Sequence, residues 1–281
     1  MSLFNAYVAL SGAVDADISR DERLAHRTTW RIGGPASMLA VCHTAAALAR
    51  VVDVLAAQDV PWVLMGKGSN ILVSDRGYEG CVIVLGRDFS HLAVSEADAT
   101  ITAGAATLLS KVVTQAMRHG LSGLEFACGI PGTLGGAVSM DAGGRREWIG
   151  RRVASVVALR PGTGLVRYAG SDIDGGYRWS SIPGNEIVLE ATLSLEPGET
   201  RAIAAEMETR LARRRRTQPM GKPSCGSVFR NPAGAEPVAK MLDELGLKGL
   251  RSGGAQVSEV HANFIVNNGS ATASDVLSLM R

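Results

Sequence analysis

Two glycine-rich stretches hold the residues of this sequence best suited to binding chemistry. MGKGSNILVSD runs from Met65 to Asp75, and GIPGTLGGA runs from Gly129 to Ala137. Glycine permits positive φ and close approach of the backbone, and successive N–H groups can then form a nest that binds a phosphate. Two such loops in one chain favour a bulky cofactor with a pyrophosphate over two unrelated turns.

Neither stretch matches a standard nucleotide-binding motif. The first lacks the Gly-Lys-Ser/Thr ending of a Walker loop, and it lacks the final glycine and following helix of a Rossmann fingerprint. A tight hairpin would also explain the first stretch, and a sharp turn packed under a helix would explain the second. In the second stretch we expect Gly135 and Gly136 to stand where side chains would block a flat or phosphate-bearing ligand.

A serine loop, PSCGSVFRNP, is a further candidate for chemistry at residues 223–232. The default role of Ser227 in such a Gly-Ser loop is a turn hydrogen bond. Cys225 invites interpretation as a thiol nucleophile, but no His/Asn partner pattern supports that role.

Six motifs follow one another along the chain. They are TTWRIGGPA (28–36), GKGSN (66–70), GLEFACGIPGTLGGAV (123–138), YRWS (177–180), PSCGSVFRNP (223–232) and VHANFIVN (260–267). Together they closely resemble the UDP-N-acetylenolpyruvoylglucosamine reductase family, also called UDP-N-acetylmuramate dehydrogenase, in its subtype with a shorter substrate domain. The resemblance covers nearly the whole chain from about Thr28. It implies an α+β protein with an FAD-binding fold of the vanillyl-alcohol-oxidase type, in which two subdomains hold the flavin and a third covers the substrate.

The resemblance also implies a reaction of cell-wall precursor synthesis. NADPH gives a hydride to non-covalently bound FAD, and the reduced flavin passes a hydride to the methylene carbon of the enolpyruvyl ether of UDP-N-acetylglucosamine, which yields UDP-N-acetylmuramate. Negative charge on the carbon beside the carboxylate requires nearby cations or hydrogen-bond donors. A positioned acid must then protonate that carbon.

Individual residues receive roles from the same resemblance. Ser227 matches the proton donor, and Arg178 matches the arginine that stabilises charge at the carboxylate, for which its planar fork is suited. The positions implied to bind FAD are Gly66, Lys67, Gly68, Ser69, Asn70, Gly104, Gly129, Ile130, Pro131, Gly132, Thr133, Gly135, Gly136 and Ala137. The positions implied to bind substrate are Tyr177, Arg214, Asn231 and His261.

Simpler roles are open to several of these residues. Arg178 could be a solvated arginine at a strand end, Tyr177 a packing residue and His261 a structural histidine. The run Arg213–Arg216 could be a solvated helix end. The family often has a lysine two residues before the proline that is Pro219 here, and this chain has Thr217.

Mixed helices and strands must position these residues. Helices are predicted over 44–60 with Thr44 as the cap, 107–119, 199–216, 237–246 and from about Thr272. The apolar runs PWVLMG (61–66), NILVSD (70–75) and GCVIVLG (80–86) predict buried strands, and residues 154–170 predict two strands joined by a Pro-Gly turn. The resemblance implies two FAD-binding subdomains, which we place at 1–85 and 86–218, and a substrate-binding domain at 219–281, and a change of composition near Pro219 agrees with the start of the third.

Composition limits the classes of function. The 281 residues are 46% hydrophobic and 20% charged, which is typical of a globular protein, and a net charge of +2 argues against a dedicated nucleic-acid binder. The four cysteines form no CxxC pair, so we expect no metal site and reduced thiols in the cytoplasm. Without a signal peptide or a long apolar run, we expect no membrane span, and we expect a monomer.

The final helix, TASDVLSLMR, ends without glycine, proline or turn chemistry, and we interpret the chain as cut within this element. The family continues into a Leu-x-Pro-Glu segment whose glutamate is a third catalytic residue, which no residue here matches. Three interpretations stay open: the reductase, a truncated form that binds FAD or the UDP-sugar without turnover, and another flavoenzyme of the same fold, such as a sugar or alcohol oxidase. The lack of a His/Cys flavin-linking motif counts against the last.

Overall fold

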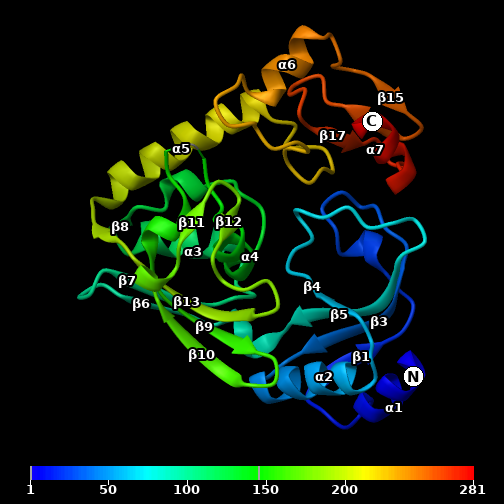
Figure 1. The fold of residues 1–281 in the computed structure, drawn as a ribbon. Helices are drawn as coiled ribbons and strands as arrows, with labels where there is room; N and C mark the ends of the chain where they lie inside the picture. The colour runs from blue at the N-terminus through cyan, green and yellow to red at the C-terminus, as the bar shows by residue number, and fades with distance from the viewer. Residues whose placement is uncertain (1, 145) are drawn as a thin grey trace. The chain divides into compact units, whose positions relative to one another are not determined.

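The computed structural model describes residues 2–144 and 146–281 (Figure 1). These residues form two compact units, which are considered one at a time. Unit 1 comprises the chain up to Ser19, Met38–Gly66 and Gly80–Leu211, and unit 2 comprises Arg20–Ser37, Lys67–Glu79 and Ala212–Arg281. The division into domains at 1–85, 86–218 and 219–281 stays a prediction.

The first sheet has the strand order β1-β3-β5-β4, with β2 also paired to β3. Its strands are β1 (Ala16–Ser19), β2 (Glu22–Arg23), β3 (Pro35–Cys42), β4 (Trp62–Leu64) and β5 (Tyr78–Leu85). Helix α2 (Ala45–Ala57) begins at the predicted cap, since Thr44 Oγ1 accepts the N–H of Ala47 at 3.1 Å. Buried side chains of α2 pack in one apolar core with those of α1 (Leu3–Leu10), β3 and β5.

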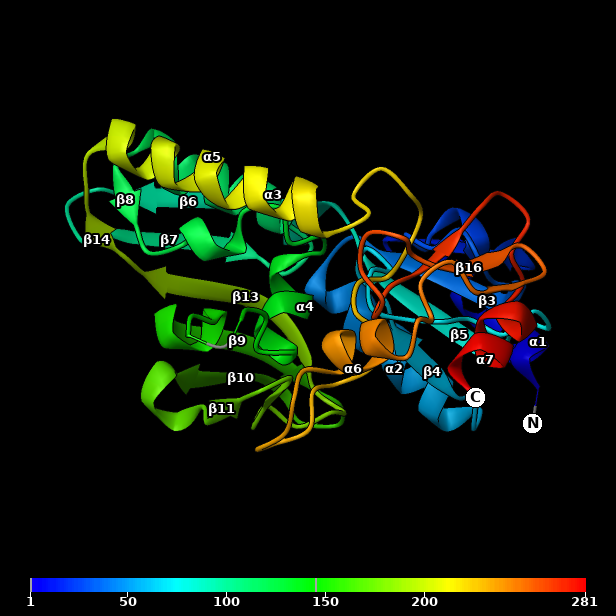
Figure 2. The same ribbon diagram turned by 90° about the horizontal axis from the view of Figure 1, so that it is seen from above.

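The second sheet is antiparallel and has the order β10-β9-β13-β7-β6. Its strands are β6 (Leu92–Ser95), β7 (Thr100–Gly104), β9 (Val153–Arg160), β10 (Gly164–Ala169) and β13 (Ile187–Ser194). Buried residues of α3 (Leu109–Arg118) and α4 (Leu134–Ser139) share a core with this sheet. Figures 1 and 2 both show α5 (Thr200–Thr217) beside α3.

Unit 2 has a small core of its own, formed around Trp30. Strands β15 (Arg251–Ser252), β16 (Ala255–Val257) and β17 (Ile265–Asn267) form a sheet, accompanied by α6 (Val238–Glu244) and α7 (Ala273–Met280). The indole N–H of Trp30 donates to the carbonyl of Ile265 at 2.8 Å, and the side-chain amide of Asn267 donates to the carbonyl of Trp30 at 2.9 Å. These two bonds join residues more than 200 positions apart in the sequence.

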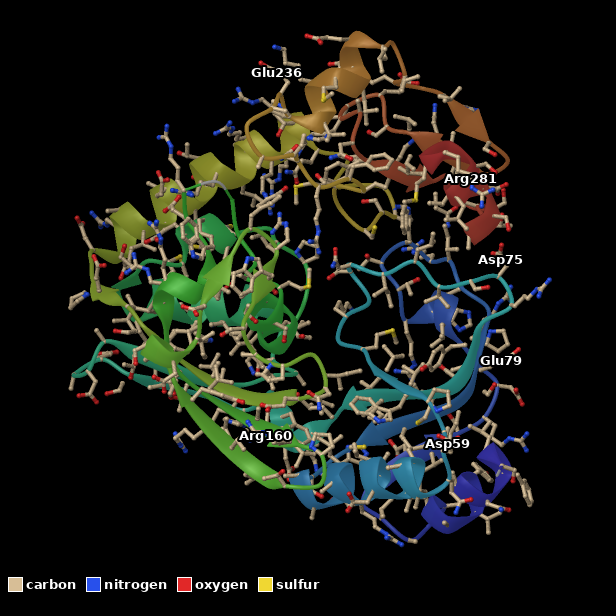
Figure 3. The ribbon with its side chains drawn as sticks, viewed as in Figure 1. Asp59, Asp75, Glu79, Arg160, Glu236 and Arg281 are labelled. Atoms are coloured by element: carbon tan, nitrogen blue, oxygen red, sulfur yellow. The ribbon has the colours of Figure 1, made fainter. Side chains whose placement is uncertain are left out.

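The carboxylate of Asp75, labelled in Figure 3, holds the first turn of α7. It accepts the N–H of Ala273 at 2.7 Å and the N–H of Ser274 at 3.0 Å. Burial acts to raise the pKa of Asp75, but these hydrogen bonds outweigh it and the net shift is downward. The aspartate is therefore a charged N-terminal cap supplied from a distant loop.

Short elements complete the description. They are β8 (Leu121–Ser122), β11 (Gly175–Gly176), β12 (Trp179–Ser180), β14 (Glu196–Pro197) and the 3-10 turns η1 (Leu24–His26), η2 (Arg87–Ser90), η3 (Glu125–Ala127), η4 (Ile149–Arg152) and η5 (Gly170–Asp172). In the part of the chain that the structure describes, no helix combines the length and the apolar character needed to cross a membrane.

Most of the predicted elements are confirmed, including the five helices and the β9–β10 hairpin. The strand predicted over 70–75 is wrong, because this segment belongs to no sheet. The segment instead packs against the backbone of residues 33–34, since a Cβ on Gly34 would lie 2.3 Å from the carbonyl oxygen of Asp75. A single backbone bond, from Gly34 N–H to the carbonyl of Ser74 at 2.9 Å, joins the two segments.

Candidate active site

In the first glycine loop, Gly66–Asn70, most backbone N–H groups make no hydrogen bond within the part of the protein that the structure describes. Among the described residues, the N–H groups of Gly66, Lys67, Gly68 and Asn70 meet no hydrogen-bond acceptor. Gly68 has φ of 62°, and a Cβ there would lie 2.3 Å from the carbonyl oxygen of Arg27. Close packing therefore fixes the loop from one side while its N–H groups stay available to an anion.

The second glycine loop uses some of its donors within the protein. The N–H of Leu134 bonds to the carbonyl of Thr107, and that of Gly135 bonds to the carbonyl of Ala105, both at 2.9 Å. Within the described chain, the N–H groups of Gly129, Gly132 and Thr133 have no acceptor. The donors that this loop can offer to a phosphate are therefore concentrated at its start, before α4.

Two glycines in this part of unit 1 serve packing. A Cβ on Gly135 would lie 2.7 Å from Cβ of Ala105, and one on Gly104 would lie 2.2 Å from the carbonyl oxygen of Phe89. The expected open space at Gly135 is thus filled by protein. At Gly136 the nearest atom to an added Cβ is Thr133 Oγ1, at 3.5 Å.

The two glycine loops meet inside unit 1. A Cβ on Gly66 would lie 2.7 Å from Oγ1 of Thr133, so the first residue of one loop touches the last residue before α4 in the other. Thr133 also caps α4, with its hydroxyl oxygen 3.4 Å from the N–H of Gly136. Within unit 1, the N–H groups of Gly66, Gly132 and Thr133 are unused among the described residues and belong to residues at or next to this contact, and such donors suit a pyrophosphate. The donor set therefore fits the phosphates of a dinucleotide such as FAD.

Arg178 lies on the tip of a hairpin in unit 1. Strands β11 and β12 pair Gly176 with Trp179, which leaves Tyr177 and Arg178 as the two connecting residues. Arg178 has φ of 70°, a conformation that costs a non-glycine residue energy and is often associated with function. Its guanidinium carbon lies 5.4 Å from the ring centroid of Tyr177, and 48% of the surface of Tyr177 is exposed.

Ser227 lies exposed in a loop of unit 2, and its hydroxyl has no hydrogen-bond partner among the described residues. Asn263 holds the neighbouring backbone. Its carbonyl accepts the N–H of Val228, its side-chain oxygen accepts the N–H of Phe229, and its side-chain amide donates to the carbonyl of Phe229, each at 2.9 Å. Asn263 is only 3% exposed. Asn263 was not predicted from the sequence as a site residue, although it belongs to the VHANFIVN motif.

Cys225 does not have the properties of a nucleophile. Burial raises the pKa of its thiol to about 12, so the reactive thiolate is scarce at neutral pH. The serine is thus the candidate for chemistry in this loop.

Thr29 links the first glycine loop to the serine loop within unit 2. Its N–H donates to the carbonyl of Gly68 at 3.0 Å, and its hydroxyl donates to the carbonyl of Ser224 at 2.7 Å. One threonine thus sets the spacing between a predicted flavin-binding loop and the loop that carries Ser227. Its place in the TTWRIGGPA motif was the only sequence signal for this role.

The residues predicted to bind the nucleotide of the substrate also lie in unit 2. Asn231 Oδ1 accepts the N–H of Val238 at 3.0 Å, where α6 begins. The ring of His261 packs edge-on against Phe264 with centroids 4.7 Å apart. Burial, together with the charge of Lys248, lowers the pKa of His261 below its ordinary value. Arg214 is half-buried in α5, whereas Arg213 and Arg215 beside it are exposed.

Comparison with known proteins decides the family of this chain. Residues 218–281 match the family profile described as the C-terminal domain of UDP-N-acetylenolpyruvoylglucosamine reductase, and residues 36–164 match that of an FAD binding domain. The reductase of Heliobacterium modesticaldum is 44% identical over 93% of this chain and 83% of its own length. That of Halalkalibacterium halodurans is 41% identical over 94% of this chain and 87% of its own length.

The chain belongs to the UDP-N-acetylenolpyruvoylglucosamine reductase family. The predicted family is therefore confirmed.

Solved structures agree with this assignment. The crystal structure of the reductase from Thermus caldophilus superposes with a TM-score of 0.82 at 36% identity, covering 95% of this chain and 93% of the other. An alkyldihydroxyacetonephosphate synthase shares the fold alone, with a TM-score of 0.52 at 17% identity over 70% of this chain and 41% of its own. The predicted α+β fold with an FAD-binding domain is confirmed, and so is the predicted cofactor, FAD.

Proposed function

We propose that this chain reduces UDP-N-acetylglucosamine enolpyruvate to UDP-N-acetylmuramate, with non-covalent FAD as its cofactor and NADPH as the reductant, in the cytoplasm of a bacterial cell. The observation that carries the proposal is the serine loop. An exposed hydroxyl that has no partner among the described residues, held on a backbone clamped by a buried asparagine, lies in the segment that matches the reductase C-terminal domain. Such a hydroxyl is free to meet a substrate.

The two glycine loops hold the cofactor in this proposal. In unit 1, the N–H groups of Gly66, Gly132 and Thr133 would bind its pyrophosphate, since they are not used within the described protein; the N–H of Gly68 in unit 2 is unused there as well. When bound, FAD supplies hydride transfer between NADPH and the enolpyruvyl group. The protein contributes orientation and an arrangement of fixed dipoles around the phosphates.

Arg178 and Ser227 manage charge and proton at the substrate. Negative charge grows beside the substrate carboxylate during reduction, and the guanidinium of Arg178 can bind that carboxylate through two parallel hydrogen bonds. Ser227 gives its proton to the carbon next to the carboxylate. Because a serine hydroxyl is a weak acid, its contribution depends on exact placement by the clamped loop.

Tyr177, Arg214, Asn231 and His261 complete the substrate contacts in the proposal. A lowered pKa keeps His261 neutral at pH 7, so it offers the nucleotide a hydrogen bond and no charge. Arg214 offers the positive charge for the diphosphate.

Anaerobic stopped-flow absorbance tests the proposal in two mixing steps. NADPH is expected to bleach the flavin band of the purified holoprotein, and UDP-N-acetylglucosamine enolpyruvate is expected to restore it with formation of UDP-N-acetylmuramate. Bleaching without recovery on addition of the substrate would indicate a binding form without turnover. Recovery with oxygen alone, combined with no response to the enolpyruvyl substrate, would indicate an oxidase of the same fold.

A further inference from the structure

A buried aspartate lies behind the hairpin that carries Arg178. Asp141 follows α4 and is only 3% exposed. Its Oδ1 accepts the N–H of Gly150 at 2.8 Å, whereas its Oδ2 has no hydrogen-bond partner among the described residues. An unsatisfied buried carboxyl oxygen is costly, so its retention calls for a reason beyond packing.

The unsatisfied oxygen lies against the base of the hairpin. A Cβ on Gly175, the first residue of β11, would lie 2.7 Å from Asp141 Oδ2. On the other side, a Cβ on Gly150 would lie 2.7 Å from Oδ1. Two glycines thus make room for one carboxyl group. A cavity of about 140 Å³ adjoins it, lined among others by Asp141, Gly175, Arg151 and Ser180.

The same hairpin is fastened to α4 at its other strand. Ser180 Oγ donates to the carbonyl of Ser139 at 3.1 Å, two residues before Asp141 in the sequence. The segment 139–141 therefore contacts both strands of the hairpin, one through a hydroxyl and the other through the carboxyl group. Arg178 is located in the two-residue connection between these strands.

Among the described residues, the elements packed against Asp141 contribute two charged groups to its surroundings. Helix α4 contributes no ionisable side chain, η4 contributes Arg151, and the hairpin contributes Arg178. The guanidinium of Arg151 stacks 3.8 Å from the ring centroid of Trp148. Other charged residues nearby are paired elsewhere, since Arg152 bonds to Glu196 and Glu147 bonds to Arg210, each at 2.7 Å.

We propose that Asp141 is a positioning residue for Arg178: its buried carboxylate seats the base of the hairpin through Gly175 and supplies the opposing charge that orients the guanidinium. The inference rests on the proposed function, since it assigns Arg178 to the substrate carboxylate. Burial raises the pKa of Asp141, while the Gly150 hydrogen bond and the charge of Arg178 act in the opposite direction. Protonation as the pH falls through this raised pKa removes the opposing charge, so Arg178 loses its orientation at acidic pH.

Asp141→Asn tests the inference, because the amide keeps the shape and the Gly150 contact while it removes the charge. In the FAD-loaded enzyme we expect reduction by NADPH to be unchanged. Reoxidation by the enolpyruvyl substrate at pH 8 should slow about tenfold to a hundredfold, as for a displaced catalytic group. As the pH falls, the wild-type rate should decline to meet the flat rate of the variant. Asp174→Asn, which removes an exposed charge next to the same hairpin, is the matched control and should behave as wild type.

A second readout does not require turnover. The side-chain Nε–H resonance of Arg178, identified by its loss in Arg178→Lys, should shift with pH in the wild type and be pH-independent in Asp141→Asn over the same range. A titrating resonance in a protein that fails to use the enolpyruvyl substrate would support the Asp141–Arg178 coupling and refute the proposed function separately. A resonance insensitive to Asp141→Asn, or equal substrate rates in both proteins at pH 8, would overturn the inference.

Gly175→Ala is a second test of the inference, for the case that Asp141→Asn fails to fold. It leaves the carboxyl group in place and adds one methyl group against Oδ2, so reoxidation by the substrate should slow while flavin content and reduction by NADPH are retained. Unchanged reoxidation in a folded Gly175→Ala enzyme would contradict the inference.

Discussion

The serine loop of unit 2 and the arginine hairpin of unit 1 hold the side chains proposed for chemistry, Ser227 and Arg178, in opposite ways. In the serine loop, the positive φ of 86° falls on Gly226, and Asn263 fixes the following backbone by three hydrogen bonds. In the hairpin, the positive φ of 70° falls on Arg178 itself. The first loop places an unstrained residue by satisfied bonds, and the second accepts strain at the functional residue.

The difference follows from what each side chain has to do. A serine has a short side chain, so its hydroxyl can be placed only by placing the backbone. An arginine reaches far from its backbone, so a turn must project it in one direction and neighbouring charges must orient it. The comparison predicts that damage to the serine loop acts through the backbone clamp, whereas damage to the hairpin acts through the guanidinium itself.

Ser227→Ala should give the largest effect. Loss of a general acid typically slows a reaction by about two to four powers of ten, so reoxidation by the enolpyruvyl substrate should fall by that amount. Reduction by NADPH should be nearly intact, because the hydroxyl has no protein partner to lose within the described chain. Rapid-mixing absorbance measures both steps, and equal damage to the two would show that the serine is structural.

Arg178→Gly should separate the cost of the positive φ at this position from the role of the guanidinium. Removal of one charge-stabilising group costs about a hundredfold to a thousandfold in rate, so reoxidation by the substrate should fall by this factor. The free energy of unfolding should rise by about 0.5–1 kcal/mol, because glycine adopts positive φ without steric cost. Arg178→Ala is the control, since it loses the same guanidinium but keeps the strained φ. If the two variants melt at the same temperature, strain at Arg178 does not matter to stability.

Asn263→Ala should destabilise the serine loop. It removes two side-chain hydrogen bonds and leaves the N–H and carbonyl of Phe229 without these partners, at a cost of about 2–4 kcal/mol. Denaturant unfolding measures that loss. Because the clamp places Ser227, the substrate half-reaction should slow in the fraction that stays folded. A fully folded variant with wild-type reoxidation would contradict the role of Asn263 as the clamp.

Thr29→Val should give the smallest effect. The change is nearly isosteric, removes the 2.7 Å bond to Ser224 and the longer 3.3 Å bond from the hydroxyl to the carbonyl of Gly68, and keeps the backbone bond to Gly68, so we expect a loss of about 1 kcal/mol in stability. Flavin affinity should stay constant, and reoxidation by the substrate should slow by only a small factor. The useful measurement is a titration with FAD, since weakened flavin binding would show that the hydroxyl supports the glycine loop as well.

The sequence allowed prediction of the fold because it carries local signals for most elements. Thr44 followed by an apolar helical pattern predicts α2, and a Pro-Gly turn between β-branched runs predicts the β9–β10 hairpin. The strand expected at 70–75 failed because apolar composition does not reveal whether a partner strand is in reach. Here the segment lies in no sheet and packs against the backbone of Gly34, where an added Cβ would lie 2.3 Å from the carbonyl oxygen of Asp75.

The candidate site was predictable only in part. Motif resemblance identified Ser227 and Arg178, to which the proposed function gives direct roles at the substrate. Asn263, Thr29 and Asp141 act through contacts over long sequence distances, such as the 195 positions between Thr29 and Ser224, and no local pattern reports these. The second glycine loop shows the same limit. We expected a side chain at Gly135 to block a ligand, yet a Cβ added there would meet Cβ of Ala105 at 2.7 Å.

The hold of Asp75 on α7 has a consequence for the order of events during synthesis. The two ends of this contact are 198 positions apart, so at roughly 5–20 residues per second the ribosome needs about 10–40 s to make the second after the first. Until then residues 67–79, which belong to unit 2, have no helix to cap. The contact that holds the first turn of α7 therefore cannot form until residues 273–274 have left the ribosome, long after the segment that carries Asp75 has been made.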